Sequence, residues 1–173
     1  VKRKAGLHKE HRKILDRALS SLDSAIASLR KYIGELQPNQ NELGLVDCIR
    51  AKVNDAHYST LFLVNLNLQM EEDSIFDPNR INHIVEILGE SLSNIARHAS
   101  AKNVDIQAAR KNEDLVLTIE DDGKGFTLES QSSGFGLRNM RDRTRLLGGN
   151  LEVDSLPNQG TKITLTVPWE ETH

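Results

Sequence analysis

The chain has 173 residues, of which 38% are hydrophobic and 27% are charged, as expected for a soluble globular domain with a sizeable core and an additional segment. The net charge of −3 argues against a direct nucleic-acid partner. The longest apolar run, from Leu61 to Val64, is too short to cross a membrane, and the single cysteine, Cys48, favours a reducing compartment. We therefore expect a cytoplasmic location and no membrane contact by this chain.

The N-terminal segment, residues 8–36, carries apolar side chains at alternating steps of four and three. They are Leu15, Leu19, Leu22, Ile26, Leu29, Ile33 and Leu36. This heptad seam predicts a long amphipathic helix that needs a partner helix; the alternative is that it packs on its own domain. Gln37-Pro38 ends the helix, which divides the chain into segment 1–38 and domain 39–173.

The first half of the main domain reads as helix, strand, helix. A second helix is predicted from Gly44 to about residue 56, and alternating apolar residues predict a strand over residues 60–68. Asp77-Pro78 combines an N-cap with proline at the first helical position. It begins a helix that is predicted to continue to Ala99.

The second half reads mainly as strands. Residues 104–109 and 115–120 form a predicted hairpin, and the polar stretch 126–133 is expected to be a loop. A helix over residues 136–147 ends at Gly148-Gly149, and strands near 150–155 and 161–167 follow. The predicted fold class is α+β, with a mixed, mostly antiparallel sheet and helices on one face.

Four short motifs carry the chemistry, and the first lies in the 78–99 helix. Glu90, Asn94 and Arg97 are four and three residues apart, which places them on one stripe of the helix. A carboxylate and an amide oxygen can hold Mg²⁺, and a guanidinium can meet phosphates. The alternative is an ordinary solvated helix face. His98 either borders the same ligand or is structural.

The second motif, Asp121-Asp122-Gly123-Lys124-Gly125, follows a strand. Asp121 can accept a hydrogen bond from an adenine amino group, while Gly123 and Gly125 let the backbone turn sharply. A simple tight turn is the competing interpretation. The P-loop and dinucleotide-binding sequence patterns are absent from the chain.

The third motif, Gly134-Phe135-Gly136-Leu137, opens a helix. Unpaired amides at a helix N-terminus form a phosphate site, although a capping role for these glycines is equally compatible. The fourth, Gly160-Thr161, supplies a hydroxyl near the base or is an ordinary strand threonine.

In this order, the four motifs resemble the N, G1, G2 and G3 boxes of the ATPase superfamily of gyrase, MutL, a heat-shock chaperone and histidine kinases. The fit is closest to bacterial two-component sensor kinases whose partners are NarL-type response regulators. The N box reads Asn94-x-x-Arg97-His98-Ala99 and only residues 126–133 separate G1 from G2. Segment 28–45 also resembles the end of that class's second dimerisation helix and its linker.

This resemblance implies a two-layer α/β sandwich of the Bergerat type that binds ATP and Mg²⁺. Asn94 would be the Mg²⁺ ligand, Glu90 would lie near the metal water or act as a base, and Arg97 would meet phosphate. Asp121 would read adenine, and His98, Gly123, Gly125, Gly134, Gly136, Leu137 and Thr161 would line the nucleotide site. The γ-phosphoryl group would pass to a histidine and then to a response regulator.

The sequence departs from the family pattern in one respect. The Glu-Leu-His-Asp type of phosphoacceptor motif is absent, and His8 and His11 precede what matches the second helix. With Val1 as the first residue, we interpret the chain as a fragment without the first dimerisation helix, unable to phosphorylate itself natively. Its implied partners are that histidine-bearing helix and a second kinase subunit. The alternatives are an anti-sigma-type serine kinase, a gyrase-like ATPase, or a non-catalytic interaction module.

Overall fold

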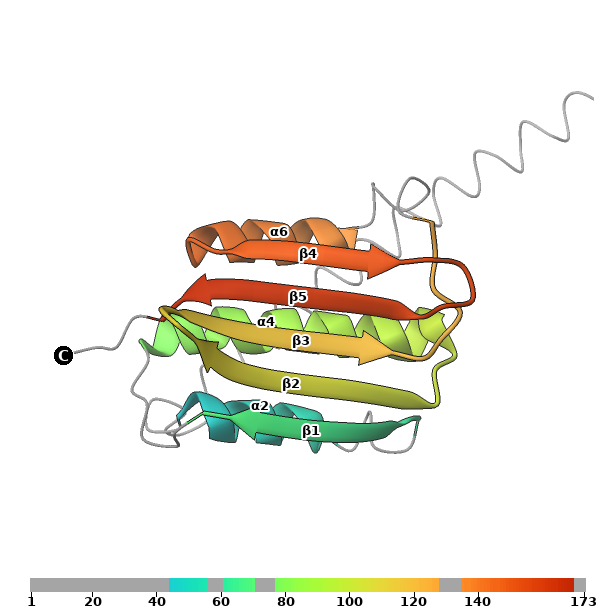
Figure 1. Cartoon of the computed structure of the whole chain (residues 1–173), viewed down its shortest axis with the longest axis horizontal. Coiled ribbons are helices and arrows are strands. Elements are labelled where there is room, and N and C mark those ends of the chain that lie inside the picture. The colour runs from blue at the N-terminus through green and yellow to red at the C-terminus, as the bar shows by residue number, and fades with distance from the viewer. Residues whose placement is uncertain (1–43, 56–60, 71–76, 128–134, 170–173) are drawn as a thin grey trace, which may run out of the picture. The chain divides into compact units, whose positions relative to one another are not determined.

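A mixed five-stranded sheet forms one layer of the protein, and helices cover one of its faces (Figure 1). The computed structural model describes residues 44–55, 61–70, 77–127 and 135–169, which all belong to the compact unit Asn41–His173. The strand order is β1-β2-β3-β5-β4. The strands are β1 (Leu63–Gln69), β2 (Asn103–Lys111), β3 (Asp114–Asp121), β4 (Asn150–Ser155) and β5 (Thr161–Pro168).

The sheet has one parallel pair and three antiparallel pairs. β1 runs parallel to β2, whereas β2–β3, β3–β5 and β5–β4 are antiparallel. Burial alternates along the strands, so that Val104 and Ile106 of β2 face the helices while Asp105 between them is exposed. Period-two alternation of this kind marks a sheet with one covered face. The predicted α+β fold, with a mostly antiparallel sheet and helices on one face, is confirmed.

Helix α4 (Pro78–Asn94) is the central helix of the covering layer. It begins as the sequence predicts, because the Asp77 carboxylate accepts hydrogen bonds from the backbone N–H groups of Asn79 and Arg80 at 2.7 and 3.3 Å. Its apolar face is directed into the core, with Ile84 and Leu88 at 0% exposure. Its end differs from the prediction: the chain continues from Ile95 to Ala99 as a π-helix, η2, rather than as α-helix.

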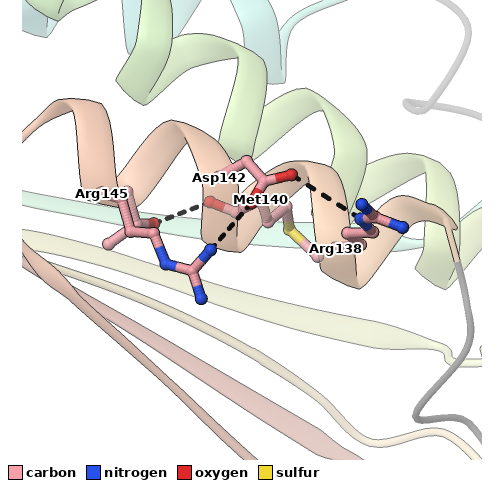
Figure 2. Close-up of polar contacts among 5 residues, drawn as sticks. Arg138, Met140, Asp142 and Arg145 are labelled. Carbon is pink, nitrogen blue, oxygen red and sulfur yellow. Dashed lines mark hydrogen bonds and ion pairs between the residues drawn. The ribbon is translucent and has the colours of Figure 1, made fainter.

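Helices α2 (Leu45–Val53) and α6 (Phe135–Leu146) flank α4. The buried Met140 sulfur of α6 lies 3.4 Å from the Ser91 hydroxyl of α4. Figure 2 shows Met140 beside the charged residues of α6, where Asp142 pairs with Arg145 at 3.1 Å and with Arg138 at 3.9 Å. Such exposed pairs contribute little stability, so buried contacts hold α6 in place.

Helix α6 ends at two glycines, as predicted. The Gly149 N–H donates to the Thr144 carbonyl and the Gly148 N–H to the Arg145 carbonyl, both at 3.0 Å. Together with φ +67° at Gly148, these bonds define a Schellman motif. The chain then enters β4 directly.

Some predicted elements end at other residues than expected, and some cannot be compared. The helix predicted to reach residue 56 ends at Val53, and the strand predicted from residue 60 begins at Leu63. The heptad helix over residues 8–36, its linker and residues 128–134 lie outside the described residues. Among the helices that are described, none is long and apolar enough to cross a membrane.

Candidate nucleotide-binding site

Glu90 and Asn94 lie one turn apart near the end of α4, next to the first turn of α6. Both side chains are partly buried. Gly136 of α6 packs directly on them: a methyl group there would overlap the Glu90 oxygen Oε1 and would lie 3.3 Å from Asn94 Nδ2. A larger residue at this position would displace the Glu90 carboxylate from its present place. The fold therefore brings residues of the first and third motifs into contact.

The π-helical turn η2 connects the first motif to the second. The Ala99 carbonyl at its end accepts a hydrogen bond from the Lys124 N–H at 2.8 Å, and Gly123 packs against Ala99. Arg97 and His98 are exposed on this turn. Arg97 belongs to this π-helical turn and not to α4. The α-helical spacing from which its alignment with Glu90 and Asn94 was predicted therefore does not apply at Arg97.

The two adjacent aspartates of the second motif have different environments. Asp121 is 6% exposed, and its carboxylate accepts the Gly123 N–H at 2.8 Å. Burial raises the pKa of this carboxyl, and repulsion from Asp122 adds to the rise, while hydrogen bonds from Gly123 and Thr161 oppose it. Asp121 is thus a buried acceptor whose carboxylate is held by Gly123 and Thr161.

Asp122 has a structural role instead. It is exposed, and it accepts hydrogen bonds from the Lys102 N–H at 2.7 Å and from the Asn103 N–H at 3.0 Å. Hydrogen bonds from Asn103, followed by the one from Lys102, lower the pKa of its carboxyl. Asp122 therefore fastens the beginning of β2 to the end of β3, next to Asp121.

The turn between β4 and β5 closes over the second motif. Thr161 pairs with Asp121 across β3 and β5. Gly160 has φ +74°, and a side chain on it would overlap the Asp121 backbone oxygen. The Asn158 N–H donates to the Lys124 carbonyl at 2.6 Å. The second and fourth motifs are therefore in direct contact.

Replacing Gly160 by alanine should destabilise the protein more than the same change at Gly148. Both glycines have positive φ, but a methyl group at Gly148 meets no atom within 4 Å. Gly148→Ala therefore measures backbone strain alone and should lower the melting temperature by about 3 °C. Gly160→Ala adds the overlap with Asp121 and should lower it by roughly 10 °C. Calorimetric melting of the two variants tests this, and equal shifts would contradict the packing described.

The remaining predicted site residues are placed as follows. Gly125, at φ +53°, lies in the turn against the carbonyl groups of Leu156 and Gly160. Leu137 is buried and belongs to the hydrophobic core. Gly134 lies outside the described residues.

Together these residues offer the chemistry that a nucleotide requires. A buried acceptor, Asp121, lies at one end of the site. At the other end, the oxygen atoms of Glu90 and Asn94 lie beside the N-terminal turn of α6, whose backbone amides suit phosphate. The part of the chain that the structure describes contains no cluster of three or more His, Cys, Asp or Glu residues able to hold a metal.

Sequence reasoning missed Ser155, which is buried beside Thr161 with the two hydroxyl oxygens 3.0 Å apart. It is the residue paired with Thr161 across β4 and β5. A known register of this hairpin would have identified Ser155 as the direct neighbour of Thr161, a predicted site residue. The sequence shows both strands but does not fix their register.

The fold is similar to those of solved histidine kinases. The histidine kinase domain of the blue-light activated histidine kinase of Erythrobacter litoralis EL346 gives a TM-score of 0.53 at 21% identity, covering 72% of this chain and 57% of that chain. Another structure of that kinase gives 0.57 at 22% identity, with coverages of 72% and 40%. The histidine kinase AdeS of Acinetobacter baumannii gives 0.62 at 19% identity, with coverages of 88% and 81%.

These similarities establish the fold, since all three identities are low. The chain spans less than two thirds of the length of the two Erythrobacter structures. A comparison with curated proteins found no significant match. The family model described as histidine kinase-, DNA gyrase B-, and HSP90-like ATPase matches residues 79–171, which is more than half of the chain and includes all four motifs. The chain belongs to this ATPase family.

Proposed function

We propose that the chain is the catalytic ATP-binding part of a bacterial two-component sensor histidine kinase. It binds Mg–ATP and transfers the γ-phosphoryl group to a histidine on a dimerisation helix, for relay to a response regulator of the NarL type. In this proposal residues 39–173 bind ATP and residues 1–38 contribute the second dimerisation helix. The observation that supports it best is the packing of Gly136 on Glu90 and Asn94, which joins two motifs far apart in the sequence.

Asp121 gives the proposed site its preference for adenine. An ionised carboxylate accepts the adenine 6-amino group, and a buried acceptor discriminates strongly against bases that lack this donor. The hydrogen bonds from Gly123 and Thr161 hold the carboxylate in place. Gly123 also allows this turn to pack closely against Ala99 and the Asp121 carboxylate.

Glu90, Asn94 and the N-terminal turn of α6 form the phosphate end. Helix amides and the exposed Arg97 guanidinium would neutralise phosphate charge. Asn94 would give Mg²⁺ one oxygen, and Glu90 would hold a metal-bound water or accept a proton. Mg²⁺ supplies charge neutralisation between the phosphates. It requires about six oxygen ligands, so these two residues fit a metal that is held mainly by ATP and water.

The NarL-type partner is the more specific part of the proposal. It rests on Arg97-His98 in the N box and on the short segment between Gly125 and Gly134. The solved structures similar to this chain are those of histidine kinases, which favours histidine as acceptor over serine. A gyrase-like ATPase or an anti-sigma-type serine kinase is the competing function within the same family.

Calorimetric titration with ATP tests the proposed binding. We expect one ATP per chain, bound about tenfold more tightly when Mg²⁺ is present. Mg²⁺ alone should give no measurable heat, because two protein oxygens cannot replace its water shell. Tight binding of Mg²⁺ without ATP would contradict a metal site in which ATP supplies most of the ligands. Absence of ATP binding would instead favour the non-catalytic interaction module.

The acceptor residue is tested in the full-length protein. After incubation with γ-labelled ATP, phosphohistidine is lost in acid and survives in base, whereas phosphoserine survives in acid. Label that survives acid treatment would establish the serine kinase alternative. Phosphate released to water with no protein label would establish the ATPase alternative.

A further inference from the structure

Ser155 is a polar residue buried at the end of β4, in the same row as the adenine-reading residues. It is 8% exposed. Asp121 pairs with Thr161 across β3 and β5, and Thr161 pairs with Ser155 across β5 and β4. Directly paired residues lie on the same face of a sheet. The three side chains therefore form a row across three strands, with Ser155 at the far end from Asp121.

The Ser155 hydroxyl makes three contacts with its surroundings. It accepts a hydrogen bond from the Phe126 N–H at 2.9 Å. It lies 3.0 Å from the Gly160 carbonyl oxygen and 3.0 Å from the Thr161 hydroxyl oxygen. Ser155 thus joins the segment after the second motif to the turn that carries the fourth.

The number of available protons fixes the direction of these bonds. The Thr161 hydroxyl has one proton, and its side chain is hydrogen-bonded to the Asp121 carboxylate, which can only accept when ionised. The Ser155 hydroxyl accepts from the Phe126 N–H and donates its one proton to the Gly160 carbonyl, which can only accept. Ser155 therefore holds the peptide group that precedes Thr161, with the Thr161 hydroxyl oxygen 3.0 Å away.

We propose that Ser155 is a positioning residue for adenine recognition: its hydroxyl orients Thr161 so that Thr161 donates to the Asp121 carboxylate and holds it ready for the adenine amino group. This inference rests on the proposed function, because it presumes that the site binds ATP. Ser155 does not itself touch the base. It acts through Thr161, and its bond from Phe126 ties the same row to the backbone that leads away from the second motif.

The test compares ATP with purine riboside triphosphate, which lacks only the 6-amino group, in the Ser155→Ala variant. We expect the variant to bind ATP about tenfold more weakly, since one oriented hydrogen bond is lost. Affinity for purine riboside triphosphate should change by less than about twofold, because the amino group is absent from that ligand. The preference for ATP should therefore fall about fivefold or more. A purely structural role would weaken both ligands equally.

Thr144→Val is the matched control. Thr144 is also a buried hydroxyl, 2% exposed, and it donates to the Met140 carbonyl at 2.8 Å. Its loss should affect stability and leave the ratio of the two affinities unchanged. If Ser155→Ala does not fold, Ser155→Cys, whose thiol is a poor donor, takes its place in the same comparison.

The outcomes separate the inference from the proposed function. A wild-type chain that binds ATP, together with a Ser155 variant that keeps the full preference for ATP, overturns the role of Ser155 and leaves the proposed function intact. A folded wild-type chain that binds neither ligand overturns the proposed function, and the inference with it.

Discussion

Replacing Asp121 by asparagine is expected to weaken ATP binding at least about 100-fold, because a charged acceptor for the adenine amino group is lost and an amide donor can take its place. The fold should persist. In the wild-type structure the Gly123 N–H lies 2.8 Å from the Asp121 carboxylate. An asparagine oxygen can accept the same hydrogen bond. Calorimetric titration with ATP measures the affinity, and thermal melting of the same samples measures the stability.

The pH dependence of stability gives a second readout for the same variant. Burial raises the pKa of Asp121 in the folded protein, so the folded state binds more protons than the unfolded state between about pH 4 and that raised pKa. The contribution of Asp121 to stability therefore decreases as pH rises through this window. Asp121→Asn should lack this decrease. ATP affinity of the wild-type chain should rise over the same window, since ionised Asp121 is the form that accepts the amino group.

Asp122→Asn is the matched control for this prediction. It makes the same chemical change one residue away, at an exposed carboxylate whose bonds from the backbone N–H groups of Lys102 and Asn103 can be accepted by an amide oxygen. Its ATP affinity should stay within about twofold of wild type. If Asp121→Asn bound ATP as well as Asp122→Asn does, Asp121 would not be the residue that recognises adenine.

Asn94→Asp in the full-length protein should reduce phosphoryl transfer roughly 100- to 1,000-fold. The change removes the amide donor beside Gly136 and places a second carboxylate one turn from Glu90. Two neighbouring carboxylates repel each other and the triphosphate. The side chain keeps its shape, so stability should change little. Transfer of label from γ-labelled ATP measures the effect.

Asn82→Asp on the exposed side of α4 adds the same charge to the same helix. It should leave phosphoryl transfer unchanged. Undiminished transfer in Asn94→Asp would remove Asn94 from the proposed metal site. A full-length wild-type protein that binds ATP and transfers no phosphate would instead identify an interaction module, for which neither substitution matters.

The sequence predicted those elements whose boundaries are set by local chemistry. Asp77-Pro78 begins α4 because the carboxylate caps two backbone N–H groups, and Gly148-Gly149 ends α6 because a residue at positive φ is needed there. The hairpin of β2 and β3 was also predicted, and Asn112 at φ +58° provides its turn. The alternation of apolar residues along the strands, together with the order of helices and strands, made the fold class predictable.

Features that depend on distant contacts could not be predicted. The sequence singled out Asp121 as the adenine candidate, but neither the burial of Asp121 nor the bonds by which Asp122 fastens β2 to β3 could be foreseen. The contact of Gly136 with Glu90 depends on how α6 packs against α4. The parallel pairing of β1 with β2, and the row that includes Ser155, depend on the register of the sheet.

The π-helical turn from Ile95 to Ala99 restricts how this segment can change in evolution. A π turn arises when one residue is inserted into an α-helix, and here the extra residue sets the position at which the Ala99 carbonyl meets Lys124. Deleting a single residue would leave a continuous helix but rotate its end by about 100°, away from the second motif. Substitutions in this turn should therefore be tolerated more easily than changes in its length, and the number of residues between Asn94 and Ala99 is itself part of the site.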